Sequence, residues 1–381
     1  MQLIEIQIIK VKLKNPRNYI IFLNHQKNPL LFFYYFMKYF CVLNNQMKRP
    51  SIKDIATLAG VSVATVSYVL NKKEGQRISE ETRKKIFNIA ETINYTPNKI
   101  AKSLKTNTTK LLGLIVADIS NEFYSHMARN LEDKALKLGY TLIIGSSDEN
   151  AEKFKKLTEL FSQQQVDGMI VAPVAGSEKT LENLINNKYP IVTIDRYLKE
   201  VEIAGITINN QEIAETTTHL LLKKDFSTII YIGYKTELPH LLDRQYGFEK
   251  AVRSSEKPVE VQYILVGLDN IAKEVHLQLE MMLGKTPANA ALYFSSNKLA
   301  VAGLSYIVKN NIKVPEQVSV VAFDETDAYD LFPTEITYIQ QPIEEMAEEA
   351  IKLLDEQISN YTATGKRVTL SAKLVPKASL K

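Results

Sequence analysis

The chain has 381 residues, which suits two or three domains, and 45% of them are hydrophobic, which excludes a wholly disordered protein. Its single cysteine, Cys41, excludes a disulfide framework and a cysteine-based metal cluster and is typical of a reducing compartment such as the cytoplasm. The net charge of +4 is unevenly distributed. Residues 48–110 hold 13 Lys and Arg against 5 Asp and Glu, whereas the residues after 110 are acidic overall. The basic block favours a nucleic-acid partner.

The first 46 residues are rich in Ile, Lys, Asn, Phe and Tyr and show no clean periodicity. Their apolar run at 30–43 is interrupted by Lys38 and is shorter than the about 20 residues that a membrane span needs. No small-residue cleavage site of a signal peptide is evident. Because Met47 begins a segment that reads like a protein start, we interpret 1–46 as a non-native extension, translated in error, or a disordered one. A genuine N-terminal anchor is the alternative.

Residues 47–97 carry the signals of three short helices. Ser51 is a good N-cap, and Asp54 stands three residues later, where a capping box has its carboxylate. Gly60 ends this first helix, Ser62 caps a second and Ser79 caps a third. The inward positions that the spacing predicts are Ile55, Ala56, Leu58, Ala59, Val66, Val69, Leu70, Ile86, Ile89, Ala90 and Ile93.

The second of these helices presents small and hydrogen-bonding side chains, which can approach base edges or phosphates in a DNA groove. A generic three-helix bundle is the alternative for the spacing alone. The string IKDIATLAGVSVATVSYVLN at 52–71 closely resembles the helix-turn-helix of the LacI/GalR (lactose-repressor) family, and the resemblance continues through 77–106. It implies that residues 62–70 lie in the major groove, with Val63 and Ala64 as the base-reading pair. Tyr68 stands where an arginine is common, which leaves the operator sequence open. The DNA-binding residues implied in the head are Ser51, Ser62, Val63, Ala64, Thr65, Ser67, Tyr68 and Asn71.

Residues 98–110 read as a hinge. Pro97 prevents continuation of the preceding segment, and a helix over 99–105 would be too short to be stable alone. The family resemblance implies that it folds against its twin in a dimer and on DNA, with Leu104 wedged into the minor groove. An ordinary basic linker is the alternative. The hinge residues expected at DNA are Asn98, Lys99, Ala101, Lys102, Leu104 and Lys105.

In residues 111–381, apolar runs alternate with helical stretches, a pattern typical of the α/β class with parallel sheets and crossover helices. The runs lie at 112–116, 141–144, 168–171, 191–194, 205–208, 228–232, 291–294 and 318–323. Polar residues follow many of them, at the strand ends where parallel sheets bind ligands. No phosphate-binding motif, metal spacing or nucleophile–base set is present, so we predict no enzyme, no cofactor and no metal. The scattered histidines, among them His126, His219, His240 and His276, are interpreted as satisfied core or surface residues.

The core also resembles the periplasmic sugar-binding-protein fold that the same family uses, over nearly all of 111–360. The segments VDGMIVAP at 166–173, IVTIDR at 191–196, DRQYGF at 243–248 and VVAFDETD at 320–327 carry this resemblance. It implies two lobes joined by three crossovers, lobe 1 at about 111–207 plus 339–365 and lobe 2 at about 208–338. The ligand-binding residues that it implies are Phe123, Tyr124, Asp195, Arg196, Arg244, Asn297 and Asp324.

Those side chains suit a polyol, because carboxylates and arginines hold hydroxyls while an aromatic face covers the apolar side of a sugar. The expected protein is therefore a cytoplasmic transcription regulator, a repressor, that binds a palindromic operator as a homodimer under the control of a carbohydrate-like effector. Lys298 replaces an acid common in the family, which leaves the identity of the effector open. An exported solute-binding protein is the alternative, but it has no use for the head; an enzyme lacks a catalytic constellation.

Overall fold

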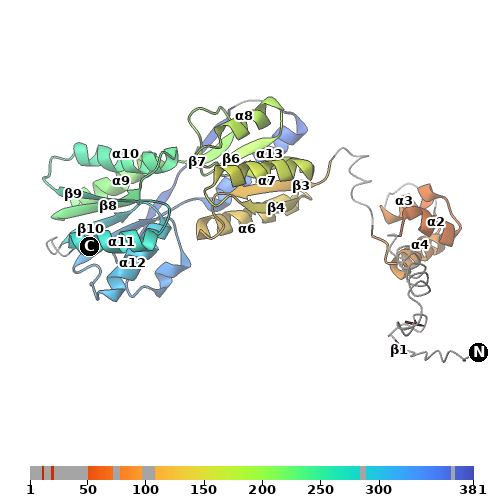
Figure 1. Ribbon diagram of the computed structural model, residues 1–381, viewed down its shortest axis with the longest axis horizontal. Coiled ribbons are helices and arrows are strands. Elements are labelled where there is room, and N and C mark those ends of the chain that lie inside the picture. The colour runs from red at the N-terminus through yellow and green to blue at the C-terminus, as the bar shows by residue number, and fades with distance from the viewer. Residues whose placement is uncertain are drawn as a thin grey trace, which may run out of the picture. The chain divides into compact units, whose positions relative to one another are not determined.

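The computed structural model describes residues 11–12, 19–20, 50–71, 78–96, 108–283, 289–361 and 365–381. The chain divides into two compact units, one ending at Ala101 and the other beginning at Lys102 (Figure 1). In the first unit, β1 (Val11–Lys12) pairs antiparallel with β2 (Tyr19–Ile20). The DNA-binding residues predicted for the hinge, at 98–105, lie outside the described residues.

Three short helices, α2 (Ile52–Ala59), α3 (Val63–Leu70) and α4 (Glu80–Thr92), make up the head. The capping box is present, because the Asp54 carboxylate accepts the backbone N–H of Ser51 at 2.7 Å. Gly60 adopts the left-handed φ of 71° that ends α2 and turns the chain. The axes of α2 and α3 differ by 108°, the geometry of a helix-turn-helix.

The head has its own small hydrophobic core, in which Ile55, Val66 and Ile86 are fully buried. The prediction that Leu58 faces this core is wrong, since 58% of this residue is exposed. Ile55, Ala56 and Ala59 form one arc of α2, and Leu58 lies off that arc because successive residues are 100° apart around a helix. The head is therefore held by fewer apolar residues than the sequence suggests.

The second unit contains two six-stranded sheets, and each forms the centre of one lobe (Figure 1). The first sheet has the order β13-β7-β6-β5-β3-β4 and is parallel throughout. The second has the order β14-β12-β11-β10-β8-β9 and is parallel except that β14 runs antiparallel to β12. The strands of the first are β3 (Leu111–Val116), β4 (Thr141–Ser146), β5 (Gly168–Val171), β6 (Ile191–Ile194), β7 (Gly205–Ile208) and β13 (Arg367–Leu370). Those of the second are β8 (Thr228–Tyr234), β9 (Glu260–Val266), β10 (Ala290–Phe294), β11 (Val318–Phe323), β12 (Thr337–Gln340) and β14 (Lys373–Val375).

Helices cover these sheets, which is why the central strands are continuous apolar runs. Every residue of β5, β6, β7, β8, β10 and β11 is buried. The first lobe carries α6 (Glu122–Lys137), α7 (Ala151–Gln163), α8 (Glu178–Asn186) and α13 (Ile343–Ser359). The second carries α9 (Asn210–Lys223), α10 (Pro239–Arg253), α11 (Ile271–Leu283), α12 (Asn297–Lys309) and the 3-10 helix η1 (Asp327–Leu331).

The chain passes between the sheets three times, after β7, after β12 and after β13. Two crossovers are bonded to each other, because Asn209 N–H donates to the Leu370 carbonyl at 3.0 Å and Ala372 N–H donates to Asn209 Oδ1 at 2.8 Å. The predicted lobe boundaries differ from this arrangement: β12 and β14 belong to the second sheet, and β13 extends the first beyond 365. These strands are only three or four residues long, too short to give a periodic signal.

Within the described residues, no single helix has the length and apolar character to cross a membrane. Among these residues, the bent pair α2 and α3 has the length and composition of a broken membrane span, and only those two properties support that interpretation.

Candidate functional site

The head presents one end and one face of α3 to solvent. Ser62 caps the helix by accepting the Thr65 N–H at 3.1 Å, and its hydroxyl lies 2.9 Å from that of Thr65. Ser62, Val63 and Ala64 are exposed, whereas Thr65, Ser67 and Tyr68 are half-buried. Ser51 lies at the N-cap of α2, and Asn71 ends α3 with its amide donating to the Ser67 carbonyl at 2.7 Å. The residues predicted for the DNA face of α3 are thus on the side opposite its buried Val66 and Val69.

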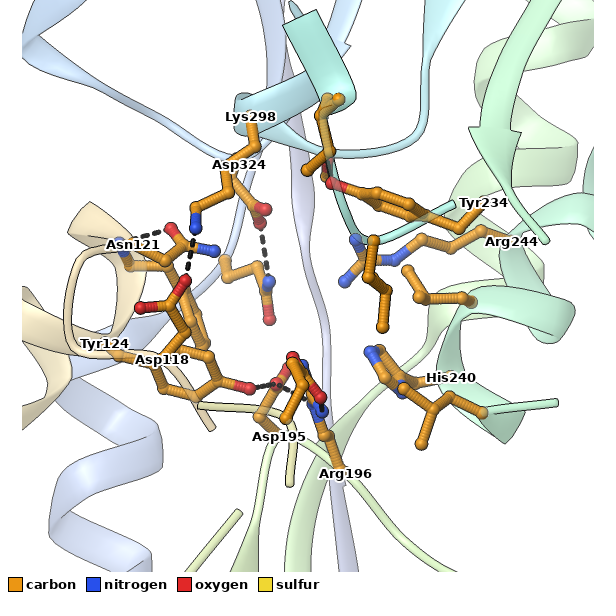
Figure 2. Close-up of a pocket in the computed structure, with 18 residues that line it drawn as sticks. Asp118, Asn121, Tyr124, Asp195, Arg196, Tyr234, His240, Arg244, Lys298 and Asp324 are labelled. Carbon is orange, nitrogen blue, oxygen red and sulfur yellow. Dashed lines mark hydrogen bonds and ion pairs between the residues drawn. The ribbon is translucent and has the colours of Figure 1, made fainter. Parts of the chain in front are cut away.

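A second candidate site is a cavity of about 90 Å³ between the two lobes of the core (Figure 2). Its walls come from the carboxyl ends of strands in both sheets and from the first turns of α6, α10 and α12, as expected for parallel sheets. It is lined by Asp118, Asn121, Phe123, Tyr124, Glu149, Asp195, Arg196, Tyr234, Leu238, His240, Leu241, Arg244, Leu268, Ile271, Ser296, Lys298, Asp324 and Gln341.

Two buried aspartates occupy equivalent places in the two lobes. Asp195 directly follows β6 and Asp324 directly follows β11, and both have a left-handed φ of 68°. A non-glycine residue in that region costs of order 1–3 kcal/mol, and such strain concentrates at ligand sites. Burial raises the pKa of Asp324, against the opposing effect of Arg244 and a hydrogen bond of 2.6 Å from the Gln341 amide. The fold therefore places two aspartates with strained backbone conformations beside one cavity.

The first-lobe wall is a connected polar group. Tyr124 Oη donates to Asp195 Oδ2 at 2.7 Å, and the pKa of this tyrosine is well above its usual value because of burial. Arg196 donates to both Glu149 oxygens, at 2.7 and 2.6 Å, and its Nε stands 3.6 Å from Asp195. Phe123 packs edge-on against Tyr124 with ring centres 5.1 Å apart, which supplies an apolar surface beside the carboxylate.

Arg244 supplies the second-lobe cation, and it is only 3% exposed, which excludes a surface ion pair. Its Nε donates to Asn210 Oδ1 at 2.8 Å and its Nη1 to the Ser295 carbonyl at 2.9 Å. The guanidinium lies 3.5 Å from the centre of the Phe323 ring. All the partners named here are neutral, so the charge of Arg244 stays available to a ligand.

His240 contradicts its predicted role as a satisfied histidine. It is 3% exposed, lines the cavity, and its Nδ1 is buried without a hydrogen-bond partner. Burial and the nearby Arg196 and Arg244 hold its pKa well below 6.5, so the ring is neutral. Gln341 Oε1 and Arg196 Nε are also buried without a hydrogen-bond partner, although Arg196 Nε is ion-paired with Asp195 at 3.6 Å. An unpaired buried polar atom costs about 1–3 kcal/mol, so a molecule bound in the cavity would gain by forming hydrogen bonds with these atoms.

The structure brings six of the seven predicted ligand-binding residues together around the cavity, and Asn297 is the exception. Its amide donates to Asn121 Oδ1 across the cleft at 2.9 Å, so it joins the lobes instead of lining the space between them. Sequence reasoning did not select Glu149, Tyr234, His240 or Gln341. Only Glu149 had a usable signal, because it belongs to the polar run after β4.

Among the described residues, no group of three or more His, Cys, Asp or Glu side chains is arranged to hold a metal ion. The cavity offers hydrogen-bonding and ionic groups of both signs together with aromatic surface. Figure 2 shows Asp195 and Arg196 facing Arg244 and His240 across it. Such a set binds a small polar molecule by many directional contacts.

Comparison with known proteins identifies both parts of the chain. The family model for bacterial regulatory proteins of the lacI family matches residues 51–98, and that for a periplasmic binding protein-like domain matches 218–380. The HTH-type transcriptional regulator RegA of Clostridium saccharobutylicum is 31% identical over 331 residues, which are 86% of this chain and 98% of RegA. The ribose operon repressor of Halalkalibacterium halodurans is 30% identical over 331 residues, 87% of this chain and 97% of the relative.

The fold is also shared with a solved structure, the lac repressor dimer bound to operator and the anti-inducer ONPF. That chain has a TM-score of 0.74 and 19% identity, and the match covers 88% of this chain and 100% of the other. The helix-turn-helix head and the two parallel-sheet lobes predicted from the sequence are therefore confirmed as a known combination. The relatives named here are regulators and not enzymes.

Proposed function

Because the chain belongs to the lacI family of bacterial regulatory proteins and is a DNA-binding transcription regulator, we propose that it is a cytoplasmic repressor. It binds a palindromic operator as a homodimer, and a small polar effector, a sugar or sugar derivative, binds in the cavity and controls that affinity. The observation that supports this effector is the cavity between the two lobes. In it, one polar atom each of His240, Gln341 and Arg196 is buried without a hydrogen-bond partner.

The exposed side of α3 supports the proposed DNA contact. Ser62, Val63 and Ala64 are accessible, and the family resemblance implies that this helix lies in the major groove. Ser51, Thr65, Ser67, Tyr68 and Asn71, with the hinge residues, complete the proposed DNA surface. Because phosphate contacts release counterions, binding should weaken steeply as salt increases.

A gel-shift titration with duplex DNA from beside the gene tests this surface. Ala64→Asp adds a carboxylate at the exposed face of α3, and we expect operator binding to fall by at least about a hundredfold, since close charge repulsion and a lost contact each amount to 1–3 kcal/mol. Asn88→Asp is the matched control, because it adds the same charge to an exposed site on α4. An equal loss of operator affinity in both variants, or no loss in either, would contradict the proposal that α3 contacts DNA.

The polar atoms of the cavity support a polyhydroxyl effector. A sugar hydroxyl can donate to Asp195 or Asp324 while accepting from Arg196 or Arg244, and the aromatic face of Phe123 suits the apolar side of a pyranose or furanose ring. The name of one relative, the ribose operon repressor, points to the same class.

Thermal-shift screening against pentoses, hexoses, their phosphates and nucleosides tests the effector class. We expect a concentration-dependent increase in the melting temperature with at least one sugar, and a change in gel shift at the same concentration. Arg244→Met should abolish both responses without unfolding the head. A nucleoside response with no sugar response would refute the carbohydrate proposal. It would not contradict the conclusion that the protein is a transcription regulator.

Exposed apolar side chains on the core support self-association. Leu277 and Met281 are one turn apart on α11 and are 54% and 55% exposed. A two-fold dimer that covers them would present two heads to a palindrome. In sedimentation velocity, Leu277→Asp should shift the protein to monomer, whereas Leu331→Asp, at an 88% exposed residue of η1, should not. A monomeric wild type would refute the dimer.

A further inference from the structure

One short segment of the first lobe reaches across the cleft at several places. Residues 117–121 connect β3 to α6, and we call residues 118–122, which include the first residue of α6, the 118–122 loop. Asp118 pairs with the ammonium group of Lys298 on α12, which also donates to the Ser120 hydroxyl at 3.2 Å. Figure 2 shows this pair and the Asn121 amide side by side at the cavity. Both members of the pair are partly shielded, with side chains 33% and 26% exposed.

Two more contacts from the same loop reach different elements of the second lobe. Asn121 Oδ1 accepts the Asn297 amide at 2.9 Å, in addition to the Phe123 N–H of its own helix at 3.1 Å. Glu122 accepts the Thr326 hydroxyl and, at 3.0 Å, the Asp327 N–H at the start of η1. A first-lobe carboxylate thus accepts hydrogen bonds from the N-cap hydroxyl and from the first N–H of a second-lobe helix.

We propose that the 118–122 loop is a latch that holds the two lobes together in the absence of effector, with the Asp118–Lys298 ion pair as its central element. The latch goes beyond the proposed effector site, because it sets how often the cleft opens before any effector arrives. Lys298 is the residue that makes this possible: with an acid at that position, Asp118 would be repelled across the cleft and not attracted. The closed form is then the resting state of the core.

Distances between spin labels measure this opening directly. Glu152→Cys and Ala272→Cys, on a Cys41→Ser background, place nitroxides on exposed residues at the starts of α7 and α11. These helices belong to different lobes, and each begins near a cavity-lining residue, Glu149 or Ile271. Double electron–electron resonance on the full-length protein, without DNA or sugar and mixed with excess unlabelled protein so that a dimer carries labels on only one protomer, should give one dominant short distance.

Two variants break the ion pair from opposite sides. Lys298→Met removes the ammonium group, and Asp118→Asn removes the charge but keeps an oxygen that can accept the Ser120 N–H, now at 2.9 Å. Each should raise the population at the longer distance by about fivefold, the change expected when a well-placed, partly exposed ion pair is lost. High salt should act in the same direction on the wild type because it screens the pair.

Two controls separate the latch from general effects of charge. Lys298→Arg keeps the cation and should keep the short distance. Lys134→Met removes a lysine that pairs with Glu344 and Glu348 within the first lobe, at 3.2 and 2.7 Å, and should leave the distances unchanged. A wild type that is mostly open, or wild-type distances in either Lys298→Met or Asp118→Asn, would overturn the latch. The regulator proposal would stand in that case, since the measurement uses neither operator nor effector.

Discussion

The buried histidine of the cavity gives a prediction about the pH dependence of core stability. His240 has a folded pKa well below 6.5 because it is desolvated and faces Arg196 and Arg244. In the unfolded chain its pKa returns to about 6.5, so at lower pH the unfolded state binds a proton that the folded state does not. Its contribution to stability is therefore complete above that pH and is lost as the pH falls. Between pH 7.5 and 5.5 the loss is on the order of 1 kcal/mol for this one group.

Urea unfolding of the core, followed by circular dichroism at several pH values, measures this loss. His240→Asn cannot be protonated, so the wild type should lose on the order of 1 kcal/mol more stability than the variant between pH 7.5 and 5.5. His219→Asn is the matched control, since it makes the same substitution at a side chain that is 44% exposed on α9 and lies outside the cavity. If the wild type and His240→Asn have the same pH slope, the imidazole is not held neutral and the reasoning from its burial fails.

Three further predictions concern the head and the cavity wall. Ile55→Ala should destabilise the head by about 2–5 kcal/mol and abolish gel shift, whereas Leu58→Ala, at an exposed site, should change thermal unfolding by less than about 0.5 kcal/mol. Gly60→Ala should cost about 1 kcal/mol in thermal unfolding, purely from its left-handed φ, because no atom lies within 4 Å of an added Cβ; Gly60→Asn should cost less. Tyr124→Phe should lower the urea-unfolding free energy of the core by about 1.5–3 kcal/mol, because it leaves the buried Asp195 without its hydroxyl donor; an unchanged value would mean that water replaces it.

Local signals in the sequence were sufficient for the head. Ser51, Ser62 and Ser79 each stand one residue before a helix, and Gly60 takes the left-handed conformation that the turn requires. Caps and turns depend on residues within four positions of each other, so no tertiary information is needed to place them. The prediction for Leu58 was wrong because its burial depends on tertiary contacts. An apolar residue at the edge of a helix face is buried only if a neighbouring element covers it.

The sequence by itself also determined the parallel sheets and the strand-end positions of Asp195 and Asp324, because fully buried strands are unbroken apolar runs and ligand groups follow them. Only the tertiary structure decided which lobe β12, β13 and β14 join, that His240 is an unpaired cavity residue, and that Asn297 and Lys298 contact the 118–122 loop. Those facts depend on contacts more than a hundred positions apart for β13, Asn297 and Lys298, on strands of only three or four residues for β12 and β14, or on the burial of a single side chain. Such features produce no periodic pattern in the sequence, so only the packing of the folded chain determines them.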